Sequence, residues 1–164
     1  MELIKKIYYR FTGYSYTNLG RLFLRLFVGI MFLQFGVRQL NQFDSLKEIF
    51  PSVLGMGTEL SLTLMIIIEI GCSLFIMTGF LTRLMSIPPI VSMIIAEAHL
   101  LRLFSETKPV YDLGWENPVY LPIMFLGFYF FILIVGPGKI SVDYFLSLHM
   151  IHTDNKSEEE LEEV

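Results

Sequence analysis

Two acidic residues, Glu69 and Glu97, stand within long apolar stretches of this 164-residue chain. An ionisable side chain near the centre of a bilayer costs about 3 kcal/mol, so such a residue is by default a candidate for function. Both acids lie fourteen residues from Arg83, one on each side of it. If the chain forms a helical hairpin that turns at Arg83, both carboxyl groups lie roughly 21 Å from the turn. We therefore predict Glu69 and Glu97 as catalytic residues that exchange protons at one depth.

Polar residues of the first apolar stretch follow one helical stripe. At 100° per residue, six positions fall within about 40° of one stripe, with glycines where a neighbouring helix can approach: Arg21, Arg25, Gly29, Phe32, Gly36 and Gln39. We predict that this stripe faces the interior of a bundle and that Arg25 and Gln39 bind a ligand. By the same arithmetic, Glu69, Cys72 and Ser73 share one face of the second helix.

Three further ligand-binding candidates lie near the outer ends of the helices: Arg38, His99 and Arg102. Glu97 and His99 point about 200° apart on one helix, so they cannot both face the interior. The sequence leaves open which of the two does.

Each candidate also has a structural interpretation. The arginines near helix ends can extend to lipid headgroups, and Glu69 can serve as a hydrogen bond between packed helices. Two arrangements of Glu69 stay open. If Glu97 faces inward, two acids at one depth keep at least one proton available for transfer. If Arg25 or Arg38 reaches in instead, Glu69 is the charged partner of an ion pair.

Several cofactors are not expected from this sequence. Cys72 is the single cysteine, so the chain has no CxxC dithiol, and it shows no zinc-ligand spacing or Gly-rich nucleotide fingerprint. His149 and His152 follow the last apolar stretch, so His99 has no second histidine for a bis-histidine haem. We predict no haem, flavin or metal, and no nucleic-acid partner.

The elements that position these residues are apolar helices. The chain is 54% hydrophobic and 17% charged, which is too apolar for an ordinary soluble domain. Four runs of roughly 17 to 21 residues match a hydrocarbon core of about 30 Å: Leu22–Leu40, Leu60–Phe80, Leu84–Phe104 and Val119–Val135. We predict an all-α, integral membrane four-helix bundle over residues 19–148. An amphipathic, basic interfacial helix is expected in residues 1–18, and an acidic tail in residues 149–164.

The distribution of basic residues predicts the orientation of the bundle. Seven Lys and Arg residues outside the runs fall on one side, against Lys47 and Lys108 on the other: Lys5, Lys6, Arg10, Arg21, Arg83, Lys139 and Lys156. The positive-inside rule therefore places both termini in the cytoplasm and the chain in the inner (plasma) membrane.

Two short segments resemble a known family. They are Gly79-Phe80-Leu81-Thr82-Arg83-Leu84, preceded by Glu69, and Gly136-Pro137-Gly138-Lys139-Ile140-Ser141-Val142-Asp143. With Arg25 and Gly29 in the first helix, this pattern resembles the DoxX family of four-helix membrane proteins over roughly residues 20–146. A basic residue usually precedes Leu40 in that family, whereas this chain has Gln39 there and Arg38 one place earlier.

Both segments also have a physical interpretation as fold determinants. Thr82 can cap the third helix, and Ser141 can cap a helix that follows the fourth. Gly136, Pro137 and Gly138 stop the fourth helix.

The resemblance implies a role in membrane-associated redox systems, because the best-known relatives are subunits of a thiosulfate:quinone oxidoreductase. The first functional hypothesis is therefore a redox subunit with quinone as its cofactor, whose intramembrane acids handle the two protons of quinone reduction. Arg38, Arg102 and Lys108 would attract an anionic sulfur substrate. Electrons would come from a protein partner or directly from the substrate.

The second hypothesis is a non-enzymatic bundle within the lipid bilayer. Such a bundle would bind a lipid or other hydrophobic molecule, form a homo-oligomer, or act as a membrane anchor or assembly factor for a partner.

Overall fold

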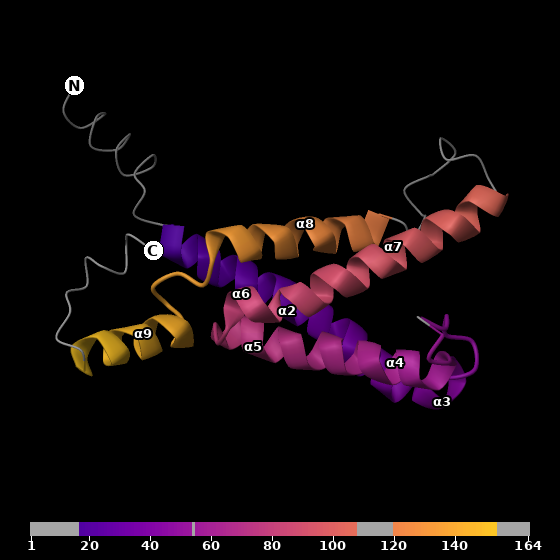
Figure 1. The fold of residues 1–164 in the computed structure, drawn as a ribbon, viewed down its shortest axis with the longest axis horizontal. Helices are drawn as coiled ribbons and strands as arrows, with labels where there is room; N and C mark the ends of the chain where they lie inside the picture. Colours follow the sequence, from indigo (N-terminus) through magenta and orange to yellow (C-terminus); the bar gives the residue numbers. More distant parts are fainter. Residues whose placement is uncertain (1–16, 54, 108–119, 154–164) are drawn as a thin grey trace, which may run out of the picture.

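The described residues form an antiparallel bundle of long helices (Figure 1). The computed structural model describes residues 17–53, 55–107 and 120–153. Three predicted features lie outside these ranges: residues 1–16 of the interfacial helix, Lys108, and the acidic tail from Asp154 onward. Helix α2 spans Thr17–Asn41 and is followed by the short α3 (Phe43–Leu46). No β-strand occurs in the part of the chain described.

The second and third membrane spans are each built of more than one helical segment. The second consists of α4 (Thr58–Ile67), a π-helical turn η2 (Ile68–Cys72) and α5 (Ser73–Thr78). The third consists of α6 (Thr82–Met85) and α7 (Ile87–Thr107). The predicted continuous helix of the third span is interrupted near Pro88 and Pro89, because proline lacks the N–H that would extend the hydrogen-bond ladder.

The last two helices complete the chain. Helix α8 spans Tyr120–Val135, and α9 spans Val142–Thr153, so that residues 149–153, which we had grouped with the tail, continue a helix. We call the end of the bundle with the α5–α6 turn and α9 the hairpin end, and the end with α3 the loop end (Figure 1).

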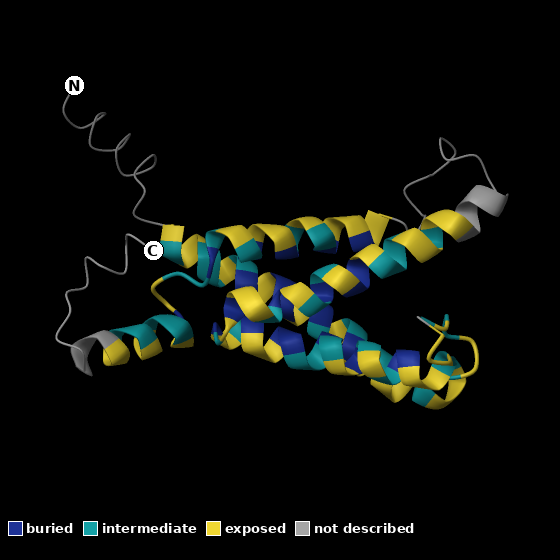
Figure 2. Cartoon of the chain, in the orientation of Figure 1, coloured by how far each residue is buried: buried dark blue, intermediate teal, exposed yellow. Residues whose placement is uncertain are grey.

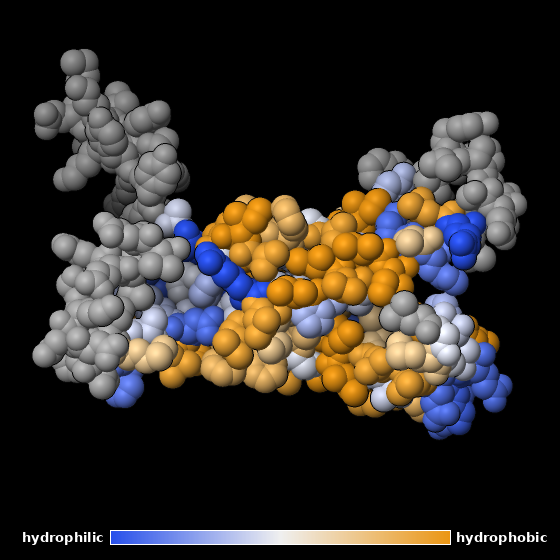
Figure 3. All heavy atoms as spheres, viewed as in Figure 1, coloured by the Kyte–Doolittle hydropathy of each residue, from blue (hydrophilic) through white to orange (hydrophobic). Residues whose placement is uncertain are grey.

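The prediction of a membrane bundle is confirmed. Three helical stretches are long and apolar enough to cross a bilayer, namely Thr17–Asn41, Thr58–Thr78 and Thr82–Arg102, while α8 is apolar but shorter, at 16 residues. Their large apolar side chains point outward, as with Phe23 at 67% exposure and Ile134 at 62%. Figure 3 shows the result as an apolar band between hydrophilic ends. Such a surface is stable in lipid and not in water.

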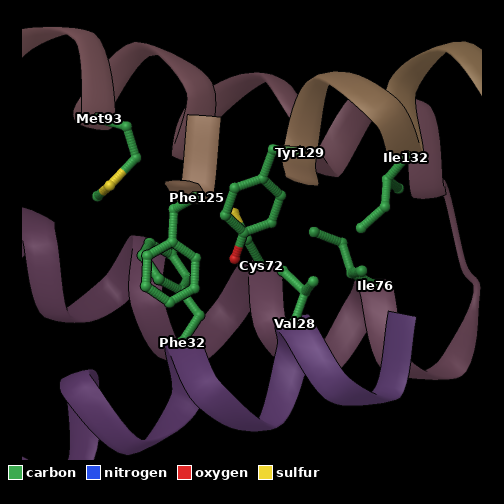
Figure 4. Close-up of a cluster of buried hydrophobic side chains, with 8 residues drawn as sticks. All are labelled: Val28, Phe32, Cys72, Ile76, Met93, Phe125, Tyr129 and Ile132. Carbon is green, nitrogen blue, oxygen red and sulfur yellow. The ribbon is translucent and has the colours of Figure 1, made fainter. Parts of the chain in front are cut away.

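The core lies where the helices cross, and Figure 2 shows the buried positions gathered there. Figure 4 shows side chains from five elements meeting in it: Val28, Phe32, Cys72, Ile76, Met93, Phe125, Tyr129 and Ile132. The Phe32 ring lies 5.4 Å from that of Phe125 and 5.2 Å from that of Tyr129, which joins α2 to α8. Because Arg25, Gly29, Phe32 and Gly36 are buried, the prediction that the α2 stripe faces the bundle is confirmed.

The hairpin end is held by a carboxylate from α9. Asp143 Oδ1 accepts the Leu81 N–H at 2.6 Å, and Asp143 Oδ2 accepts the Thr82 N–H at 3.0 Å and the Thr82 hydroxyl at 3.2 Å. The prediction that Thr82 caps the third helix is therefore wrong, because the Thr82 hydroxyl donates and Asp143 supplies the cap. The predicted Ser141 cap is confirmed, since the Ser141 hydroxyl accepts the Tyr144 N–H at 3.1 Å.

Candidate functional site

Glu69 lies in the π-helical turn η2, which the sequence did not predict. A π turn inserts one extra residue into a helix and frequently occurs at functional sites. The Ser73 hydroxyl donates to the Glu69 carbonyl oxygen at 2.5 Å within this turn. Gly36 of α2 lies directly against it, since a Cβ there would be 2.9 Å from Glu69 Cβ and 2.7 Å from Ile70 Cγ1. This close approach brings α2 and the acid together.

The partner of the Glu69 carboxyl is an amide and not a cation. Glu69 is 2% exposed, and Gln39 Nε2 donates to Glu69 Oε1 at 3.0 Å. Glu69 Oε2 and Gln39 Oε1 are buried and have no hydrogen-bond partner among the residues described. The predicted alternative of an ion pair with Arg25 or Arg38 is wrong. Arg25 donates to the Ile140 carbonyl oxygen at 2.5 Å, and Arg38 is exposed.

A cavity of about 700 Å³ follows α7 from Ile87 to Leu100 and faces α4 and η2 from Ser61 to Ile68. The loop from Phe50 to Met56 also contributes to its wall. The cavity lies where α4 and α7 diverge toward the loop end (Figure 1). Its volume lies in the range of sites for drug-sized ligands.

The cavity borders the lipid-facing surface. Leu64, Ile87 and Val91 line it and are 38%, 46% and 49% exposed. A ligand dissolved in the bilayer can therefore reach the cavity from the side, without crossing water.

Few polar side chains line this cavity. Ser61 donates to the Gly57 carbonyl oxygen at 2.6 Å and accepts the Val53 N–H, and Ser92 donates to the Pro89 carbonyl oxygen, so both serines are satisfied by the protein. Gln39 and His99 are left as polar groups for a ligand in the described wall, together with Ser52. Gln39 thus connects the cavity to Glu69.

The sequence of this membrane domain also matches a protein family. Residues 20–100, about half of the chain, match the DoxX family model. The chain belongs to the DoxX family. Comparison with curated proteins and with solved structures gave no significant match. The DoxX match covers α2, Glu69 and the α5–α6 turn, whereas the Gly136–Asp143 segment of the predicted resemblance lies outside it.

Within this DoxX fold, the remaining predicted site residues are dispersed. His99 is exposed and lines the cavity. Glu97 does not line it, although both of its carboxylate oxygens are buried, without a hydrogen-bond partner among the described residues. Of the two residues, only His99 therefore lines the cavity, and the structure does not bring Glu97 to the cavity beside Glu69.

The basic residues are also spread out. Arg25 is buried at the hairpin end, and exposed Arg38 and Arg102 do not line the cavity. In the loop after α2, Lys47 donates to Asp44 at 2.9 Å, and this hydrogen bond raises the pKa of Lys47. Its charge is thus already paired.

Sequence analysis missed three contributions to the site: the π turn, the Gln39–Glu69 hydrogen bond and the loop that closes the cavity. The pairing had a signal, because Gln39 lies one turn after Gly36 on the predicted interior stripe. The position of the loop had no such signal, because the residues from Phe50 to Met56 show no pattern that indicates contact with other helices.

Proposed function

We propose that this DoxX protein is a membrane subunit of a quinone-linked redox system that oxidises thiosulfate or another sulfur or thiol compound. The proposal places it in the inner membrane with both termini in the cytoplasm. The observation that carries it is the apolar cavity beside the lipid, with Gln39 in its wall and the buried Glu69 behind that amide. Quinones are apolar, ring-shaped and carry two carbonyl groups, which suits such a cavity.

The polar groups suit both redox forms of a quinone. Gln39 Oε1 can accept a hydrogen bond from a quinol hydroxyl, and the His99 imidazole can donate to a quinone carbonyl. Reduction of a quinone to the quinol takes up two electrons and two protons. In the proposal, the sulfur compound or a partner protein supplies the electrons, because the chain has a single cysteine and no dithiol. Glu69 and His99 exchange the protons with the cavity.

The test compares two acids of the same membrane domain. Glu69→Gln keeps the size of the side chain and removes its proton, whereas Glu97→Gln makes the same change on α7, away from the cavity wall. With equal membrane insertion confirmed, we expect quinone reduction in proteoliposomes to fall about 100-fold or more in Glu69→Gln, and much less in Glu97→Gln. Glu69→Leu tests packing separately. Full turnover in Glu69→Gln would refute the proton-transfer role.

A second function rests on the same cavity, since its largely apolar wall also suits a lipid or another hydrophobic molecule held without chemistry. Binding of decylubiquinone and of a saturated alcohol of similar size to the purified chain distinguishes the two. Equal affinity, with no quinone reduction in membranes that carry the chain, favours the non-enzymatic function. Selective binding of decylubiquinone, lost in Gln39→Leu, favours the redox subunit.

A further inference from the structure

Two arginines from different helices flank the segment Gly136–Gly138 between α8 and α9. A Cβ on Gly136 would lie 3.2 Å from both Nε and Nη2 of Arg83, which belongs to α6. A Cβ on Gly138 would lie 3.0 Å from Cδ of Arg21, which belongs to α2. Since two residues span at most about 7 Å, the two arginine side chains contact neighbouring points of one short segment.

The segment itself is fixed in place. Asn18 Oδ1 accepts the Lys139 N–H at 3.2 Å, which ties the segment to the start of α2. The Asp143 N–H donates to the Gly79 carbonyl oxygen at 2.9 Å, which ties it to the α5–α6 turn. Gly136 and Gly138 have φ of 74° and 78°, a conformation that glycine adopts without strain. Arg21 and Arg83 thus lie against a backbone segment that is fixed in place.

At the hairpin end, the described residues carry more positive charges than nearby acidic side chains can neutralise. Arg83 is exposed and Arg21 is half-buried, and neither forms an ion pair in the part of the chain described. Buried Arg25 lies close by and directs one nitrogen to the Ile140 carbonyl oxygen. The nearby acid, Asp143, already accepts three hydrogen bonds from the α5–α6 turn.

The two arginines lie at the level of lipid headgroups. Gly136 directly follows α8, whose exposed Ile134 faces hydrocarbon, and Arg21 stands two residues before exposed Phe23. In Figure 3, hydrophilic atoms at the hairpin end border the apolar band directly. A lipid of the same membrane can present its phosphate at this level.

We propose that Arg21 and Arg83, which lie next to Gly138 and Gly136, bind the phosphate of an anionic phospholipid. Guanidinium groups match phosphate oxygens with two parallel hydrogen bonds, and basic pockets between membrane helices bind anionic headgroups. This site is separate from the cavity along α7, and it stands whether or not that cavity binds quinone.

The test measures thermal unfolding of the purified full chain in detergent. We expect phosphatidylglycerol to raise Tm more than phosphatidylcholine at the same concentration. Arg83→Gln should weaken the apparent affinity for phosphatidylglycerol about five- to tenfold, since each basic residue near a membrane surface contributes on the order of 1 kcal/mol. Arg83→Lys keeps the charge without the two-pronged geometry and should lose part of the affinity.

The matched control is Arg102→Gln, which removes an exposed arginine from α7 far from the hairpin end. It should keep the response to phosphatidylglycerol. An equal loss in Arg102→Gln, or equal Tm increases with the two lipids, would overturn the proposal. A similar Tm increase with soluble glycerol 3-phosphate would assign the site to a free phosphate compound and overturn the lipid assignment. Each comparison uses the change in Tm upon lipid addition, which a purely structural effect of Arg83→Gln does not alter.

Discussion

Gly79 should tolerate no side chain, for two separable reasons. Its φ of 75° is in the left-handed region, where a residue with a Cβ costs about 1–2 kcal/mol. A Cβ there would also collide with Arg25 Nη1 and lie 2.6 Å from Ser141 Cβ. Arg25 cannot easily withdraw, because it is 1% exposed and hydrogen-bonded to the Ile140 carbonyl oxygen.

The magnitude follows from the two contributions. Overpacking of a closely packed contact costs about 1–3 kcal/mol, so Gly79→Ala should lose about 2–5 kcal/mol of stability in total. Gly79→Leu should be worse and should also lower the yield of inserted protein. Both changes act through the contact between α2, the α5–α6 turn and the start of α9.

Three other glycines separate the contributions. Gly55 has φ of 75° and no atom near its Cβ position, so Gly55→Ala isolates the backbone strain of about 1–2 kcal/mol. Gly36 is helical but closely packed, so Gly36→Ala isolates the steric cost of about 1–3 kcal/mol. Gly127 is helical and open, and Gly127→Ala should be neutral or stabilising by about 0.5–1 kcal/mol.

The assay is the thermal unfolding of the four alanine variants in one detergent. The expected order of Tm runs from Gly127→Ala at the top to Gly79→Ala at the bottom, with the other two between them. If Gly79→Ala unfolds at the temperature of Gly127→Ala, neither the φ nor the close contact with Arg25 holds this turn.

Three further predictions concern other parts of the chain. Asp143→Ala removes the cap of the α5–α6 turn and should lower Tm by the equivalent of about 1–2 kcal/mol, while decylubiquinone affinity stays unchanged; a fall in affinity would connect the turn to the cavity. Ser61→Ala removes the hydrogen bond that holds Val53 and should speed dissociation of decylubiquinone about fivefold, with half-buried Thr63→Val as the control. A reporter fused after Val164 should signal cytoplasm and one inserted near Asp112 the outer compartment, and the reverse pattern would refute the orientation.

The sequence was sufficient to predict the membrane spans and the interior face of α2. A segment that crosses the bilayer must be apolar over its whole length and must satisfy its backbone hydrogen bonds within a helix, because the hydrocarbon core supplies no water. The α2 stripe followed from helical periodicity and from Gly29 and Gly36, at which a neighbouring helix comes too close for a side chain. The length of an apolar run and the periodicity of a stripe are local properties, so a single sequence is enough to predict them.

The candidate site could be predicted only in part, because it depends on contacts between distant segments. Periodicity assumed an uninterrupted α-helix around Glu69, whereas packing against Gly36 accompanies a π turn there. Counting residues from Arg83 placed Glu97 at the depth of Glu69, although only His99 of the pair on α7 lines the cavity. The depth of a side chain in the membrane follows from counting residues along the helix. Whether that side chain points into the cavity depends on how α7 diverges from α4.

The turn segments that carry the family resemblance have a physical role different from that of the candidate site. Gly79, Thr82 and Asp143 form hydrogen bonds and close contacts at the hairpin end, and those interactions determine how the helices pack. The cavity instead follows α7 and α4, and Gln39 in its wall donates to Glu69. A guanidinium at that position would hold Glu69 as a charged carboxylate, whereas an amide can bond with either form of the acid. Exchange of a proton at Glu69 would therefore break no ion pair among the residues described, which supports the proposed proton-handling role of the buried acid.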